Sequence, residues 1–91
     1  MKICWSPEAA ADFAGIVDYI HKQNASAANR VALNMYESIT SLESFPNRGR
    51  PGRVAGTREL VLSPLPFIVV YRVQRSIVEV ARVLHGSQRW P

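Results

Sequence analysis

The sequence predicts an α+β fold in which an N-terminal helical hairpin packs on a small antiparallel β-sheet. Apolar residues in the first half recur at helical spacing, whereas the second half changes to the alternating, β-branched composition of strands. A short strand-like segment, Ile3-Cys4-Trp5, precedes the first helix. The expected order is therefore β-α-α-β-β-β, and a chain of 91 residues is long enough for one domain, which we expect to span 1–91.

The first helix is expected to begin at Ser6-Pro7-Glu8. The Ser6 hydroxyl can accept a hydrogen bond from a free backbone N–H, and Pro7 suits the first helical position. Four apolar residues then follow at i, i+3, i+4 and i+7, which places them on one helical face: Phe13, Ile16, Val17 and Ile20.

A second helix is expected after the polar break at Gln23-Asn24-Ala25-Ser26. Its apolar face comprises Ala28, Val31, Met35, Ile39 and Leu42. It should end near Phe45, because Pro46 disfavours helical geometry in the residue before it. Since the connection is short, the two helices should lie antiparallel.

Strands are expected in the second half. Leu60 and Leu62 alternate with their neighbours up to an interruption at Ser63-Pro64-Leu65-Pro66. The next segment, Phe67-Ile68-Val69-Val70-Tyr71, is β-branched and aromatic throughout, which indicates the middle strand of the sheet.

The last two strands should form a hairpin with a tight turn at Arg75 and Ser76. A two-residue turn places Arg72 opposite Glu79. Strict alternation then puts His85 on the same face as Glu79, together with Ile68 and Val70. It puts Arg82 among apolar neighbours, which predicts either a buried ion pair or a local bulge; those neighbours are Val78, Val80 and Leu84.

Composition narrows the possible partners and compartment. Eleven basic and seven acidic residues give a formal net charge of +4, which favours a negatively charged partner. A lone cysteine, Cys4, excludes an internal disulfide, and we expect a cytoplasmic protein. The longest apolar run, Phe67 to Tyr71, is far shorter than the roughly 20 residues of a membrane-spanning helix, so no membrane span is expected.

A basic loop rich in glycine and proline, Gly49 to Leu60, leads into the strands. Loops held by a rigid scaffold often carry binding residues, and a guanidinium group matches carboxylates and phosphates. The loop and the segment before it could therefore bind nucleic acid or an acidic protein; the arginines concerned are Arg48, Arg50, Arg53 and Arg58.

In combination, these segments resemble the RelE/ParE superfamily of bacterial toxins. The resemblance rests on the two helices and on four later motifs: Gly49-Arg50-Pro51, Gly56-Thr57-Arg58-Glu59-Leu60, Val69-Val70-Tyr71-Arg72-Val73 and Val83-Leu84-His85-Gly86. It implies a type II toxin that arrests growth when free and is neutralised by a small antitoxin encoded beside it. It also implies that the complex binds operator DNA mostly through the antitoxin.

Two activities occur among proteins of this superfamily. RelE-like members cleave mRNA in the ribosomal A site, and ParE-like members poison DNA gyrase. In the RelE-like pattern an arginine usually lies three residues before the strand tyrosine, whereas here Ile68 precedes Tyr71. Loss of an organised cation at a reacting phosphate costs several orders of magnitude in rate. The resemblance therefore favours a gyrase poison that is not an enzyme, with an mRNA endonuclease as the alternative and a basic nucleic-acid-binding module as a distant third.

The candidate site residues follow from this choice. His85 is the catalytic candidate under the nuclease alternative, because histidine suits proton transfer near neutral pH. The candidates for target binding are Arg50, Arg53, Arg58, Arg89 and Trp90. An antitoxin could add a strand or place a helix in a groove, and the candidates for its binding are Trp5, Phe13 and Leu84. One cysteine and two distant histidines offer no zinc-ligand spacing, so neither a metal nor another cofactor is expected.

Overall fold

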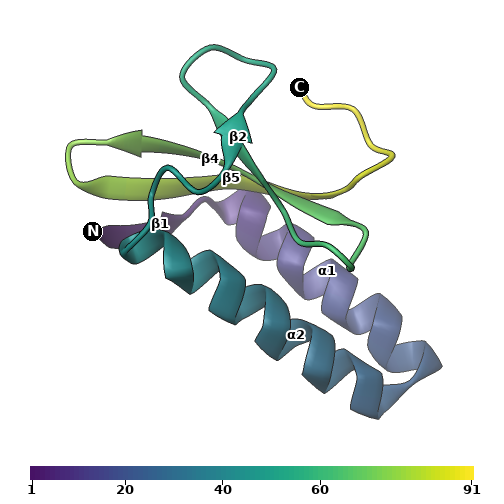
Figure 1. The fold of residues 1–91 in the computed structure, drawn as a ribbon. Coiled ribbons are helices and arrows are strands. Elements are labelled where there is room, and N and C mark those ends of the chain that lie inside the picture. The colour runs from purple at the N-terminus through teal and green to yellow at the C-terminus, as the bar shows by residue number, and fades with distance from the viewer.

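The computed structural model describes residues 1–91, in which two antiparallel helices cover one face of a five-stranded sheet (Figure 1). The elements are β1 (Lys2–Trp5), α1 (Pro7–Gln23), α2 (Ala25–Thr40), a 3-10 turn (Ser41–Glu43), β2 (Arg50–Pro51), β3 (Arg58–Val61), β4 (Phe67–Gln74) and β5 (Ile77–His85). The α+β class and the helical hairpin are confirmed.

Side-chain caps define the helical hairpin. The Ser6 hydroxyl accepts a hydrogen bond from the Ala9 N–H at 3.0 Å, as predicted for the start of α1. Asn24 ends α1 by donating its backbone N–H to Ile20, and its side chain accepts from Ala27 N–H at 3.1 Å at the start of α2. Helix α2 ends at Thr40, earlier than predicted, because the chain tightens into the 3-10 turn before it reaches Phe45.

The strand order is β1-β5-β4-β3-β2, and the sheet is mixed rather than wholly antiparallel. Strand β1 pairs parallel with β5, while the other neighbours are antiparallel. No local turn joins β1 to β5, so their relative direction depends on the path of the helical hairpin, which the sequence pattern does not reveal. The short strand β2 within the basic loop was also not expected; it pairs with Arg58 and Glu59.

The β4–β5 hairpin has the predicted turn and a bulge that changes the faces of its last residues. Arg75 and Ser76 have positive φ angles of 49° and 67°, and Arg72 lies opposite Glu79, as predicted. Tyr71 pairs with Val80 but Val70 pairs with Arg82, which leaves Ala81 as an extra residue.

Because of the bulge, the predictions of which face of the sheet Leu84 and His85 occupy are wrong. Val83, instead of Leu84, joins the core beneath the helices, and Leu84 pairs with Ile68 on the opposite face. His85 pairs with Phe67, and the two ring centroids lie 5.9 Å apart. Strict alternation fails here because one additional residue inverts the orientation of every later side chain in the strand.

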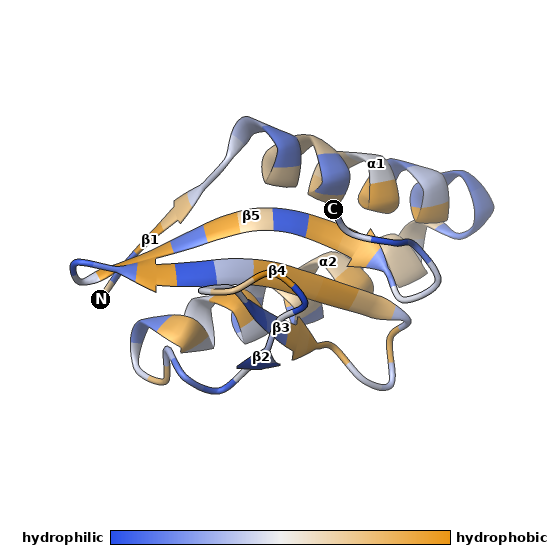
Figure 2. Cartoon of the chain, turned by 90° about the horizontal axis from the view of Figure 1, so that it is seen from above, coloured by the Kyte–Doolittle hydropathy of each residue, from blue (hydrophilic) through white to orange (hydrophobic).

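The core lies between the helices and the sheet. β4 and β5 are mostly hydrophobic, whereas β2 is hydrophilic (Figure 2). The largest fully buried side chain is Tyr71, whose hydroxyl accepts from Gly49 N–H at 2.8 Å and donates to the Pro46 carbonyl at 2.7 Å. Tyr71 therefore holds the segment before β2 against the sheet. Neither helix has the length and hydrophobicity of a membrane-spanning segment.

Candidate functional site

A small pocket lies on the face of the sheet away from the helices, and we call it the sheet pocket. Its floor comes from β4 and β5, and its walls are the loop after β2 and the C-terminal tail, residues 86–91. Figure 1 shows these two segments on the same side of the sheet, with the tail curving back toward the loop. Segments far apart in the sequence therefore form one site.

The floor of the sheet pocket is apolar. Val70 is 1% exposed and Leu84 is 6% exposed, although neither belongs to the core cluster beneath the helices. Ile68 completes the floor and is half-buried. Strands β4 and β5 thus contribute three aliphatic side chains, and neither lysine nor arginine, to the floor of the pocket.

The rim carries the charges, and they are not equivalent. Arg50 lies opposite Glu59 in the sheet and donates to the same carboxylate oxygen from Nη2 at 3.0 Å and from Nε at 3.2 Å. Arg53 is exposed and takes part in none of the hydrogen bonds or ion pairs within residues 1–91. Arg53 is therefore the rim cation whose charge is available to a partner. Trp90, half-buried, contributes to the wall formed by the tail.

Hydrogen bonds around His85 fold the tail directly after β5. The His85 N–H donates to Gln88 Oε1 at 2.7 Å, and the Gly86 N–H donates to the Pro66 carbonyl at 2.7 Å. The Ser87 N–H donates to His85 Nδ1 at 3.1 Å, so a neutral His85 ring carries its proton on Nε2. His85 borders the sheet pocket, but its ring packs on Phe67.

Two other candidates for target binding lie apart from this site. Arg58 donates from Nη1 to the Gly49 carbonyl at 2.7 Å and so supports the basic loop from within. Arg89 is exposed in the tail and does not line the sheet pocket. Of the four arginines and one tryptophan proposed from sequence, the structure brings together Arg50, Arg53 and Trp90.

The candidates for antitoxin binding are also separated. Trp5 and Phe13 pack edge to face with ring centroids 5.5 Å apart, half-buried against the core at the junction of helix and sheet. Leu84 lies on the floor of the sheet pocket. These three residues do not form one surface.

The edge of β5 beyond β1 is closed by side chains of the first helix and its cap. Asp12 accepts from Arg82 Nε at 2.7 Å and from the Val83 N–H at 3.0 Å, and Ser6 Oγ donates to the Ala81 carbonyl at 2.8 Å. Arg82 thus has the predicted bulge beside it, and it also forms an ion pair, although this pair is partly exposed and not buried as predicted. An added strand would have to displace these bonds.

Two opposing effects act on the pKa of Asp12. Burial alone would raise the pKa of this carboxyl group. The hydrogen bonds from Arg82 and the Val83 N–H, with the positive charge of Arg82, outweigh burial, so the pKa of Asp12 lies below its ordinary value of 3.8. The ion pair is therefore a feature of the folded chain that acid would remove.

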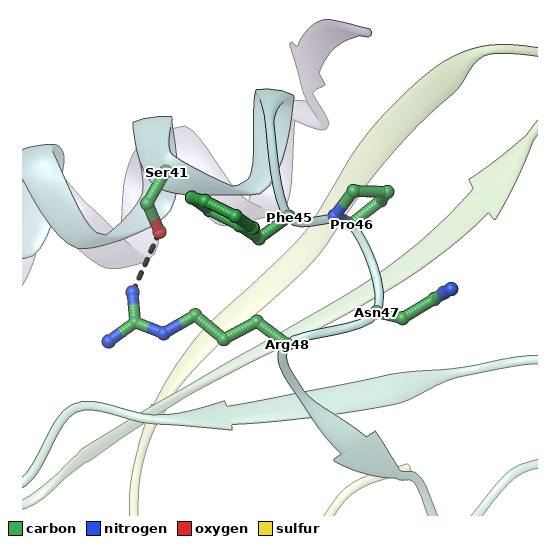
Figure 3. Close-up of a pocket in the computed structure, with 5 residues that line it drawn as sticks. All are labelled: Ser41, Phe45, Pro46, Asn47 and Arg48. Atoms are coloured by element: carbon green, nitrogen blue, oxygen red, sulfur yellow. Dashed lines mark hydrogen bonds between the residues drawn. The ribbon is translucent and has the colours of Figure 1, made fainter.

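A second hollow, which we call the helix-end hollow, lies after the last turn of α2. Its residues are Ser41, Phe45, Pro46, Asn47 and Arg48. Figure 3 shows the Phe45 ring and the Arg48 side chain on either side of the hollow, with Asn47 turned away. Arg48 Nη1 donates to Ser41 Oγ at 2.7 Å, and Phe45 is 65% exposed. Arg48 has no acidic partner within residues 1–91.

Sequence reasoning missed the helix-end hollow and the contributions of Glu59 and Gln88 to the sheet pocket. A signal for exposed apolar surface near the hollow was present: Leu33 and Tyr36 fall outside the buried stripe of α2, and both are exposed, as is Phe45, which lines the hollow. No comparable signal marks Glu59 or Gln88, because their positions depend on pairing with β2 and on the fold of the tail.

Comparisons with known proteins place these features in a family. Residues 3–90 match the profile described as "ParE toxin of type II toxin-antitoxin system, parDE". The chain is 40% identical over 90 residues to "Putative toxin Y4kP" of Sinorhizobium fredii, covering 99% of this chain and 93% of that protein. It is 36% identical over 87 residues to "Toxin RelE2" of Caulobacter vibrioides, covering 96% of this chain and 97% of that one.

Two solved structures share the fold. The "Chromosomal ParDE TA system from P. aeruginosa" superposes with a TM-score of 0.86 at 28% identity, over 93% of this chain and 95% of that chain. The solution structure of the protein HP0894 from Helicobacter pylori superposes with a TM-score of 0.60 at 19% identity, over 97% of each chain, and this likeness concerns the fold alone.

Proposed function

Because the chain belongs to the ParE toxin family of type II toxin-antitoxin systems, we propose that it arrests growth by binding DNA gyrase through the sheet pocket and its rim. A cognate antitoxin neutralises it, and the toxin-antitoxin complex binds operator DNA through the antitoxin. Gyrase acts on the chromosome, so we place the toxin in the cytoplasm.

The apolar floor of the sheet pocket is the observation that carries this proposal. Cleavage of RNA without a metal needs cations and proton-transfer groups arranged around the reacting phosphate. The floor instead presents Ile68, Val70 and Leu84, and the charge of Arg50 on the rim is balanced by Glu59. Such a surface suits contact with a protein better than stabilisation of a phosphorane.

Arg53 and Trp90 are the residues that we expect to contribute most to gyrase binding. Arginine and tryptophan are enriched among the residues that dominate binding energy at protein interfaces. Both lie at the sheet pocket, where Arg53 has no partner within the chain. We do not expect Arg58 to bind gyrase, because its guanidinium group already donates a hydrogen bond to the Gly49 carbonyl.

The antitoxin is proposed to cover the outer face of α2 and the helix-end hollow. Exposed apolar side chains commonly mark an interaction surface. Leu33 and Tyr36 are exposed three residues apart on α2, and the exposed Phe45 lines the helix-end hollow. Arg48 beside Phe45 would pair with an acidic residue of the antitoxin. Trp5 and Phe13 are less suited to this role, because they already pack at the junction of helix and sheet.

A supercoiling assay with purified gyrase tests the proposal. We expect the free chain to inhibit supercoiling and to trap cleavage complexes, and its complex with the antitoxin to do neither. Arg53→Glu should weaken inhibition, whereas Arg30→Glu, an equal charge change on an exposed position of α2, should not. A chain that leaves gyrase unaffected at micromolar excess would refute the gyrase proposal.

Ribosome-dependent mRNA cleavage is the second candidate, and His85 is the observation that favours it. Its ring borders the sheet pocket, and Nε2 is left free because Nδ1 accepts from Ser87. The relative from Caulobacter vibrioides also carries the name RelE2. If the chain is this enzyme, mRNA is cut on translating ribosomes and His85→Ala lowers the rate at least about 100-fold, the usual contribution of a general acid or base. An unchanged rate would remove His85 from catalysis.

A further inference from the structure

We infer that the sheet pocket is a receptor for one apolar side chain of a peptide segment, with a neighbouring carboxylate bound by Arg53. The inference rests on the proposed function, because it names the chemistry by which the same site would recognise its protein target. It concerns a peptide ligand, and a nucleic-acid ligand is the alternative outcome of the test below.

The size of the pocket limits the ligand to a single side chain. Its volume is about 130 Å³, well below the roughly 300–1,000 Å³ of pockets that hold a whole small molecule. One leucine-sized side chain would rest mainly on Ile68, the half-buried residue of the floor, because Val70 and Leu84 beneath it are almost fully buried. Transfer of that side chain from water to an aliphatic surface is favourable and needs no polar partner on the floor.

The charges around the pocket favour a carboxylate next to that side chain. Arg50 is already paired with Glu59, so Arg53 is the cation of the rim that can accept an anionic partner. A guanidinium group binds a carboxylate through two parallel hydrogen bonds, and an exposed arginine can turn to meet it. We therefore expect Arg53 to bind one acidic residue of the peptide next to the inserted side chain.

A nucleic-acid strand fits these features less well. Each nucleotide brings a phosphate, and single-stranded binders combine a cationic groove with aromatic platforms for the bases. Here the floor is aliphatic and offers no donor or acceptor to the edge of a base. Of the aromatic rings at the pocket, His85 packs on Phe67 and Trp90 is half-buried, and the carboxylate of Glu59 in the lining would repel a phosphate. The arrangement therefore distinguishes between the two classes of ligand.

Trp90 provides a direct reporter of binding. It lines the sheet pocket and also a neighbouring hollow beside Ala81 and Arg82, so a side chain inserted over the floor would change the surroundings of its indole ring. The chain has two tryptophans, and Trp5→Phe leaves Trp90 as the only one. The fluorescence of Trp90 can then be followed in the full-length chain.

The experiment titrates the Trp5→Phe chain with capped pentapeptides up to millimolar concentration. The probe has a central leucine between two glutamates; in one control serine replaces the leucine, and in another lysines replace the glutamates. A pentauridylate tests the nucleic-acid alternative. We expect saturable binding of the probe, with each control peptide weaker by about tenfold or more, a loss of roughly 1.4 kcal/mol.

Variants of the receptor complete the test. Arg53→Glu should weaken the probe about tenfold or more, since it replaces a charge-assisted contact by repulsion, and Ile68→Asn should do the same through the floor. Arg30→Glu, on the outer surface of α2, should change affinity less than about twofold. Thermal melts of each variant establish that the chain is folded.

Several outcomes would overturn the inference: equal binding of all three peptides, tighter binding of pentauridylate, or no effect of Arg53→Glu in a folded chain. Gyrase inhibition is measured on the same preparations. Inhibition without peptide binding would reject the side-chain receptor and leave the gyrase proposal, whereas peptide binding without inhibition would support the receptor and reject gyrase as the target.

Discussion

Replacing Tyr71 by phenylalanine is expected to destabilise the chain through two hydrogen bonds alone. The Tyr71 side chain is fully buried, and its hydroxyl joins the Gly49 N–H to the Pro46 carbonyl. The substitution keeps the ring and the packing around it. What it removes is the link from β4 to the segment that leads into β2 and the sheet pocket, whereas the bond from Arg58 of β3 to the Gly49 carbonyl remains.

The magnitude follows from the groups left without a partner. Gly49 is buried, so its N–H cannot recover a bond to water, and such a loss costs about 1–3 kcal/mol. Pro46 is half-buried, so its carbonyl can regain water and adds about 0.5–1 kcal/mol. We expect a total near 2–3 kcal/mol, which in a chain of this size lowers the melting temperature by about 10–20 °C.

Thermal unfolding followed by circular dichroism measures this change, with Tyr36→Phe as the matched control. Tyr36 is 56% exposed and its hydroxyl makes no hydrogen bond within the chain, so its removal should shift the melting temperature by no more than a few degrees. Hydrogen exchange should also be faster at Gly49 in the Tyr71 variant. Equal melting temperatures for the two variants would refute the argument.

Two further predictions concern Asp12 and two glycines. Since the pKa of Asp12 is lowered in the folded chain, its pairing with Arg82 stabilises above the ordinary pKa of 3.8 and is lost as pH falls through the folded value. Asp12→Asn should therefore be less stable than wild type at pH 7, with a gap that narrows toward pH 3 in urea melts; a gap independent of pH would contradict the assignment. In Gly49→Ala the new Cβ would lie 2.7 Å from the Tyr71 hydroxyl oxygen, so this variant should be less stable than wild type. Gly15 lies in open space on α1, so Gly15→Ala should gain about 0.5–1 kcal/mol of stability. A higher melting temperature for Gly49→Ala than for Gly15→Ala would contradict this packing.

Much of the fold could be predicted from sequence because the signals are local. The Ser6 cap, the break at Asn24 and the turn at Arg75 and Ser76 each depend on residues within one turn of the chain. The Arg72–Glu79 register followed directly from the turn. The direction of β1 and the existence of β2 could not be predicted, since both depend on strands paired across long stretches of sequence.

The candidate site was predictable only in part. Arg50, Arg53 and Trp90 were candidates for target binding from the sequence, and the structure places all three around the sheet pocket. The sequence did not distinguish one arginine from another. The partners of each guanidinium distinguish them: Glu59 balances Arg50, a carbonyl holds Arg58, and Arg53 remains free. Those partners become neighbours only after the loop has folded onto the sheet.

Periodicity, helix caps and motif order were sufficient to predict the α+β class, the helical hairpin and the toxin family, because all three are properties of short stretches of chain and of their order. Which side chains face the sheet pocket depends instead on the folded arrangement of the strands, the loop and the tail. The single extra residue at Ala81 moves Leu84 to the floor and His85 toward Phe67. The alternation around Arg82 predicted either a buried ion pair or a bulge, but it could not decide between them, because a bulge forms where pairing and packing with distant segments outweigh regular alternation.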